Sequence, residues 1–214
     1  GYLGLGINEK LNGSGEDLYD LGILFECLGF HAAPLCLTGC LVDVAQTLQK
    51  FSKNENHQSI VSSIANGEIY TSAILEPLNH DPENPTTTAV FDGEKIIING
   101  TKYLSEISSL AKGILISASS NKGVILALVK TDNVKLTQLT STANSPLFKV
   151  ELKNVSIEES DVVHEEGRGL EALKYLLQIN MVMRSYIALG VTNKITSLIA
   201  SYTSEREQFG RVIG

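Results

Sequence analysis

The end of the sequence carries side chains that could bind a nucleotide. Arg206 is followed closely by Gln208 and Phe209 in the stretch SEREQFG. A guanidinium offers a planar fork of hydrogen-bond donors that suits phosphate oxygens, a glutamine amide can donate and accept, and an aromatic ring can cover a base. These three residues are therefore candidate ligand-binding residues. The plainer interpretation is a solvated arginine at a helix end, with Phe209 in a core.

Arg184 is the second candidate. It lies among Met181, Met183 and Ile187 in an apolar stretch with helical spacing. A charge in such surroundings needs a partner, and the plain interpretation is an ion pair with a carboxylate inside a helical bundle.

The usual patterns of metal and nucleophile sites are missing. The four histidines are scattered at positions without metal-ligand spacing, and no metal is expected. Three cysteines, Cys27, Cys36 and Cys40, form no CxxC pair; we expect reduced thiols on a buried helix and a cytoplasmic compartment. The stretch GYLGLG has the wrong glycine spacing for a dinucleotide fingerprint, and SEISSL has no elbow geometry or partner histidine for a serine hydrolase.

The composition is that of a globular protein. The chain has 214 residues, 43% hydrophobic and 19% charged, which allows one large domain or two small ones. A net charge of −7 without a basic patch argues against a nucleic-acid partner. No apolar run is long enough to span a bilayer, so no membrane span is expected.

Three kinds of segment must position the candidate residues. Apolar residues recur at helical spacing over about 18–65, with Asp17 or Ser14 as the N-cap of the first helix, Gly29 and Pro34 near its end, and a last helix over 55–65. From Tyr70 the pattern becomes β, with at least six strands and a hairpin turn at Asp92-Gly93. Because no helix interrupts these strands, we expect an antiparallel barrel or sandwich.

The helical period returns at Gly167 and predicts one or two long amphipathic helices whose apolar faces this segment alone cannot cover. The sequence thus predicts an α+β fold: an N-terminal helical domain over 1–68, a middle β domain over 69–164, and the start of a C-terminal four-helix bundle over 165–214.

That order, with its junction sequences, resembles the acyl-CoA dehydrogenase family of flavoproteins over essentially the whole chain. The matching stretches are GYLGLGINEKLNGSGEDLYDLGILFECLG, NGEIYTSAILEP, INGTKYLS, MVMRSYIALG and YTSEREQFGR. The resemblance implies FAD as cofactor, and oxidation of an acyl thioester, on CoA or on a carrier protein, to the α,β-enoyl form. It also implies a dimer or tetramer, an electron-transfer acceptor, and a chain cut after about the first two helices of the bundle.

The resemblance assigns roles to the candidates. Arg206, Gln208 and Phe209 match the cluster that binds the pyrophosphate and adenine half of FAD across a subunit interface. Arg184 matches an arginine that lines the acyl-thioester site, although Met181 stands where the family often has an acidic residue.

The flavin-ring positions depart from the family pattern. Ile74 and Leu75 match the residues that touch the flavin ring, and Leu75 stands where a threonine is usual. The loop LNHDPENP that follows lacks the family's glycines and serine. Read without gaps, the hairpin places Leu104 and Glu106 where an aromatic residue and a threonine or serine are usual. A one-residue slip would supply Tyr103 and Ser105 instead.

The general base is not found in the chain, and the resemblance places a catalytic glutamate beyond Gly214. Two alternatives follow from the departures. The chain could be a non-catalytic homologue that serves as partner subunit of an active relative, in a heteromer to whose FAD it lends the Arg206 cluster. It could also be a flavin oxidase or monooxygenase on the same fold.

Overall fold

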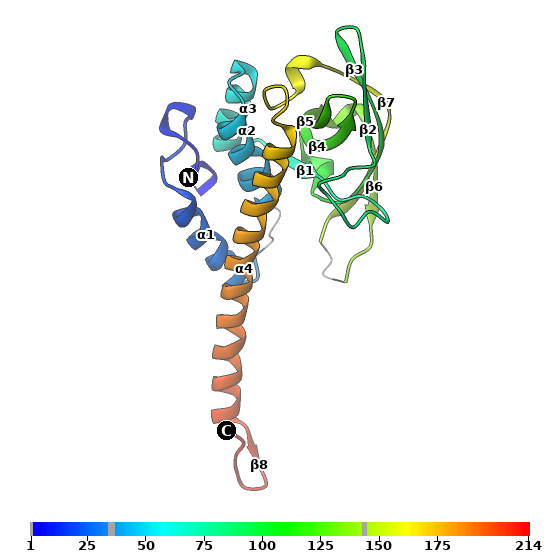
Figure 1. Ribbon diagram of the computed structural model, residues 1–214. Helices are drawn as coiled ribbons and strands as arrows, with labels where there is room; N and C mark the ends of the chain where they lie inside the picture. The colour runs from blue at the N-terminus through cyan, green and yellow to red at the C-terminus, as the bar shows by residue number, and fades with distance from the viewer. Residues whose placement is uncertain (1, 34–36, 143–144) are drawn as a thin grey trace.

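The computed structural model describes residues 2–33, 37–142 and 145–214, so Pro34 and Cys36 lie outside the described residues. Helices come first, then strands, then one long helix, which confirms the predicted α+β class (Figure 1). The helices are α1 (Leu18–Phe30), the π-helical η3 (Thr38–Val44), α2 (Ala45–Phe51), α3 (Glu55–Ala65) and α4 (Gly169–Glu205). The strands are β1 (Tyr70–Ala73), β2 (Thr88–Asp92), β3 (Lys95–Glu106), β4 (Gly113–Ser120), β5 (Gly123–Lys130), β6 (Lys135–Leu139), β7 (Leu147–Glu158), β8 (Glu207–Gln208) and β9 (Arg211–Val212).

The helix start and end signals predicted from the sequence agree with the observed bounds of α1 and α3. Asp17 caps α1, since its carboxylate accepts from the backbone N–H groups of Tyr19 and Asp20. Helix α3 begins after Asn54, whose side chain accepts from Asn56 N–H, and ends at Asn66-Gly67. Both ends of α3 agree with the prediction from the sequence.

The sheet has seven strands in the order β1-β4-β2-β3-β7-β6, with β5 paired to β4. The hairpin β2–β3 turns after Asp92, and Gly93 there has φ +61°, as the sequence predicts. The sheet is mixed, however, and not purely antiparallel, because β4 pairs in parallel with β1 and with β2. The long β2–β3 excursion between β1 and β4 provides the crossover that a parallel pair needs.

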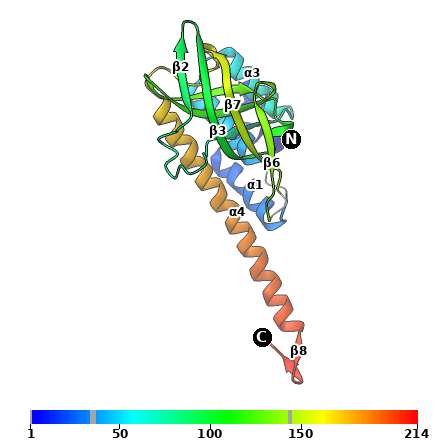
Figure 2. The ribbon, with the colours of Figure 1, turned by 90° about the vertical axis from the view of Figure 1, so that its right-hand side faces the viewer.

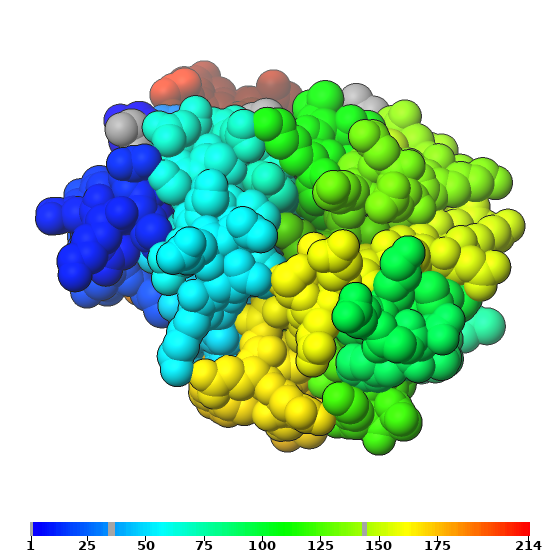
Figure 3. Space-filling model, turned by 90° about the horizontal axis from the view of Figure 1, so that it is seen from above, coloured from blue at the N-terminus to red at the C-terminus, as the bar shows by residue number. Residues whose placement is uncertain are grey.

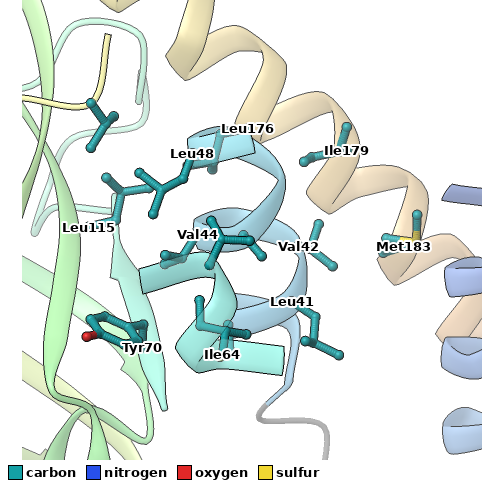
Figure 4. Close-up of a cluster of buried hydrophobic side chains, with 14 of the residues drawn as sticks. Leu41, Val42, Val44, Leu48, Ile64, Tyr70, Leu115, Leu176, Ile179 and Met183 are labelled. Carbon is teal, nitrogen blue, oxygen red and sulfur yellow. The ribbon is translucent and has the colours of Figure 1, made fainter. Parts of the chain in front are cut away.

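Helix α4 is one continuous helix. The sequence pattern is compatible with either one or two helices over this segment. Its first half packs Leu176, Ile179 and Met183 into the core of the helical segment (Figure 4). Close packing against α1 depends on glycines: a Cβ on Gly190 would lie 1.9 Å from the Glu26 carbonyl oxygen, and one on Gly22 2.5 Å from the Tyr186 ring.

The second half of α4 extends away from the body of the molecule (Figure 2). Its exposed apolar side chains include Val191, Ile195, Leu198, Ile199 and Tyr202. This is the uncovered face that the sequence predicts for the start of a bundle. No helix of the described chain is long and apolar enough to cross a membrane.

The helices and the sheet are packed directly together. Figure 3 shows the α3 region in contact with the segment that precedes α4. The Asn54 side chain donates to the Ser160 carbonyl across this joint (3.1 Å), and Lys53 pairs with Glu165. We keep the division at 68 and 164 as a proposal about domains.

Candidate functional site

A cavity of about 340 Å³ lies where β1, β3 and α4 meet. Its volume falls in the range of small-molecule sites. The lining residues are Asp43, Ser72, Ala73, Ile74, Leu75, Tyr103, Leu104, Glu106, Leu147, Leu176, Leu177, Asn180 and Arg184. Four of the residues proposed from the sequence, Ile74, Leu75, Leu104 and Arg184, are thus brought together.

The wall formed by Ile74 and Leu75 is fixed by a buried ion pair behind it. Lys102 Nζ lies 2.7 Å from Glu76 Oε1, and it also donates to the Ile74 carbonyl and to Ser117 Oγ. Both charged side chains are enclosed, at 0% and 1% exposure. Burial lowers the pKa of Lys102 to about 8, although the hydrogen bond to Glu76 and the negative charge of Glu76 both act to raise it.

The same glutamate organises the loop that follows. Burial raises the pKa of Glu76, but donors outweigh it and hold this pKa well below its usual range. The donors are Lys102 Nζ, the Thr86 and Thr87 N–H groups, Thr86 Oγ1 and Asn79 Nδ2. The loop therefore has a defined path although it lacks the family's glycines and serine.

A β-bulge in β3 decides which hairpin residues reach the cavity. Lys102 pairs with Val150 and Ser105 with Phe148, so Tyr103 and Leu104 together oppose a single residue of β7. Leu104 has φ +58°, a strained conformation for a leucine, and both bulged residues line the cavity. At the bulge, the ungapped reading thus contributes Leu104 to the cavity and the slipped reading contributes Tyr103.

Ser105, proposed from the slipped reading, is placed elsewhere. Its hydroxyl donates to the Ser72 carbonyl (2.7 Å) and accepts from Ser108 Oγ, and it is not among the lining residues. The next residue, Glu106, lines the cavity, as the ungapped reading expects. A carboxylate therefore stands where the slipped reading would have put a hydroxyl.

Glu106 is the partner of Arg184. Arg184 Nη2 lies 3.1 Å from Glu106 Oε1, and Arg184 Nε donates to Asn180 Oδ1 (2.8 Å). The Arg184 side chain is 54% exposed, so this pair is at the cavity wall and not inside a core. The expected carboxylate partner exists, but it comes from the β-sheet instead of a helical bundle.

Asp43 is a cavity residue that reasoning from the sequence missed. Helix η3 lies close against β1 because residue 39 is glycine: a Cβ there would be 2.6 Å from Thr71 Oγ1. This packing brings Asp43 Oδ2 to 2.5 Å from Ser72 Oγ and Oδ1 to 2.7 Å from Asn180 Nδ2. A lone acid in the apolar stretch CLVDVA was the available signal.

Burial governs the charge state of Asp43. It raises the pKa of Asp43 to about 6, against the hydrogen bonds from Asn180 and Ser72 and the charge of Arg184. The charge of Glu106 raises this pKa further.

The Arg206 cluster is far from the cavity. Arg206 follows the last residue of α4, about 33 Å of helix axis beyond Arg184 at the usual rise per residue. Gln208 belongs to the small hairpin β8–β9, and Phe209 at its tip is fully exposed. Phe209 is therefore not a core residue of the described chain, and the cluster cannot serve the same chain's cavity in this arrangement.

No group of three or more His, Cys, Asp or Glu side chains that could hold a metal ion occurs in the described ranges.

No protein-family model matches the chain. Curated relatives do. The probable acyl-CoA dehydrogenase YngJ of Bacillus subtilis is 25% identical over 229 residues, covering 100% of this chain and 60% of the relative. The mitochondrial short-chain specific acyl-CoA dehydrogenase of Rattus norvegicus is 26% identical over 232 residues, covering 98% and 54%. The chain thus spans between half and two-thirds of the length of these relatives.

Solved structures show the same fold. The ChsE4-ChsE5 complex of Mycobacterium tuberculosis superposes with a TM-score of 0.89 at 24% identity, over 99% of this chain and 57% of that chain. The prolyl acyl carrier protein oxidase AnaB gives a TM-score of 0.90 at 21% identity, over 100% and 61%. The chain is thus similar in sequence to acyl-CoA dehydrogenases and has part of the fold of these solved structures.

Proposed function

We propose that the polypeptide is an FAD-dependent oxidoreductase that oxidises an acyl thioester, on CoA or on a carrier protein, to the α,β-enoyl thioester. The observation that carries the proposal is the cavity, which gathers Ile74, Leu75, Leu104 and Arg184 from three separate elements. These are residues to which the family resemblance assigns flavin and substrate contacts. We also propose a reducing, cytoplasmic compartment.

The residues fit FAD at two separate places. The side chains of Ile74, Leu75 and Leu104 give the cavity an apolar wall suited to a planar ring. Arg206 and Gln208 are exposed, so their polar groups can meet the phosphates of a cofactor held by a neighbouring subunit. When bound, FAD supplies the acceptor for a hydride from the acyl chain.

Each of this chain's own residues then has a limited task. Arg184 positions the thioester beside the apolar wall, because its guanidinium is half exposed at the cavity and fixed by Glu106 and Asn180. The proton acceptor is proposed to be a glutamate beyond Gly214. The exposed apolar face of α4 is proposed to be covered by further helices or by a second subunit.

The direct test is a visible absorption spectrum of the purified complete polypeptide, before and after heat release of any bound chromophore. The proposal expects a flavin band at near one FAD per subunit and bleaching of that band by a thioester substrate. A colourless protein that takes up no added FAD would contradict it.

A partner-subunit function is the second candidate. Two observations favour it. The cavity wall where the flavin ring would lie carries Leu75 and Glu106. The Arg206 cluster is exposed, and no described residue of this chain covers it. In that case the chain lends Arg206, Gln208 and Phe209 to the FAD of a related subunit. Full FAD occupancy and turnover by this polypeptide alone would rule the second candidate out.

A further inference from the structure

The cavity wall holds more negative than positive charge. Among the described lining residues, Asp43 and Glu106 are acids and Arg184 is the one cation. Arg184 is paired with Glu106. Asp43 has no salt bridge to any cation of the described chain.

Asp43 is instead held by neutral donors. Its two oxygens accept from Ser72 Oγ and Asn180 Nδ2, while its side chain is buried in the joint of η3, β1 and α4. A buried carboxylate without a counter-ion is costly, and its elevated pKa is one sign of that cost. A cation in the cavity would remove this cost.

One oxygen of Glu106 also lacks a donor from the described chain. Its Oε1 accepts from Arg184, but its buried Oε2 has no hydrogen-bond partner within the described ranges. Acceptors are thus in excess among the polar lining groups, and the apolar lining side chains include Ile74, Leu75, Leu176 and Leu177. An unmet acceptor next to an unpaired acid favours a ligand that brings N–H donors and positive charge.

We infer that the cavity takes an acyl thioester whose acyl group carries a protonated amine, with Asp43 and Glu106 as the residues that select it. This inference rests on the proposed function and specifies its substrate class. The amine supplies the counter-ion that Asp43 lacks, and the carbon chain lies along the leucine side. A plain aliphatic acyl group of the same shape leaves Asp43 without a counter-ion and Glu106 Oε2 without a donor.

The test compares binding of matched pantetheine thioesters to the complete polypeptide by calorimetry. The pairs are 3-aminopropanoyl with butanoyl, 4-aminobutanoyl with pentanoyl, and prolyl with cyclopentanecarbonyl; each pair differs in one amine. Pantetheine is common to CoA and carrier proteins, so the choice of carrier does not enter. We expect at least one amine to bind about tenfold or more tightly than its isostere, as a charge-assisted hydrogen bond provides.

Charge-neutral variants assign the preference to residues. Glu106→Gln and Asp43→Asn should each reduce the amine preference, which is the ratio of amine to aliphatic affinity within a pair, severalfold. Glu94→Gln is the control: it removes one carboxylate from the exposed β2–β3 turn and should leave the amine preference unchanged. If Asp43→Asn does not fold, Glu106→Gln alone decides.

The outcomes separate the two proposals, because FAD content is read by absorbance on the same samples. Preference for all three aliphatic thioesters by an FAD-loaded protein overturns the amine inference and leaves the proposed function standing. An amine preference that survives both variants overturns the assignment to Asp43 and Glu106. A protein that binds neither FAD nor any thioester overturns both proposals.

Discussion

Two carboxylate–cation pairs anchored on strand β3 differ in almost every physical respect. Lys102 and Glu76 are enclosed, 2.7 Å apart, and both have further hydrogen-bond partners. Arg184 and Glu106 are 3.1 Å apart, partly exposed, and one carboxylate oxygen has no partner among the described residues. The enclosed pair is complete without a ligand, whereas the open pair is not. A buried charge whose partners are all supplied by the protein stabilises the fold, whereas a charge beside a cavity that lacks a partner indicates a ligand-binding site.

The largest effect is expected from breaking the enclosed pair. Lys102→Met leaves Glu76 buried without its cation and should lower the free energy of unfolding by about 3–5 kcal/mol. Urea denaturation measures the change. Lys112→Met is the matched control, because it breaks the exposed pair with Glu68 and should change stability little. Equal stability of the two variants would show that the enclosed pair is not structural.

The next effect is a pH dependence that sharpens the contrast at the cavity. The pKa of Asp43 is raised in the folded state from 3.8 to about 6, so its neutral form favours folding. This contribution is present below pH 3.8 and is lost as the pH rises through 6. It amounts to roughly 3 kcal/mol at most, given about 1.4 kcal/mol per unit.

Asp43→Asn isolates that contribution. The difference in unfolding free energy between wild type and variant, measured by urea denaturation at several pH values, should change mainly between pH 4 and 6. A difference that stays constant over this window would mean that Asp43 titrates as it does in the unfolded chain.

A smaller effect on stability is expected at the open pair. Arg184→Met should cost less than about 1 kcal/mol, because a half-exposed ion pair contributes little. Binding of a pantetheine thioester, measured by calorimetry, should nevertheless weaken by about tenfold, as loss of a charged hydrogen bond predicts. A large loss of stability with unchanged binding would reverse the assignment of the two pairs.

The smallest effect on stability is expected at the tip of α4. Arg206→Ala should leave thermal unfolding of the β domain unchanged, because Arg206 is exposed. FAD affinity, measured by flavin fluorescence titration, should fall if Arg206 binds the FAD of a neighbouring subunit as proposed. Arg211→Ala, in the same small hairpin, is the control and should retain affinity. Unchanged FAD affinity in Arg206→Ala would remove the cofactor role from this residue.

Local signals in the sequence determined the elements. Asp17 as the cap of α1, the bounds of α3 and the turn after Asp92 follow from side chains that bond to nearby backbone or tolerate positive φ. The quoted motifs likewise indicated the family over the whole chain. These features depend on residues within a few positions of one another, so one sequence suffices to find them.

Only the tertiary structure decided the site. The bulge that brings Tyr103 and Leu104 to the cavity depends on the pairing of β3 with β7, and the placement of Asp43 depends on the contact of Gly39 with β1. The partner of Arg184 is 78 positions away in the sequence, on β3. The parallel pairing of β4 with β1 and β2 is equally non-local. Such contacts are fixed by packing between distant segments, and no local pattern encodes which distant residue will fill a given space.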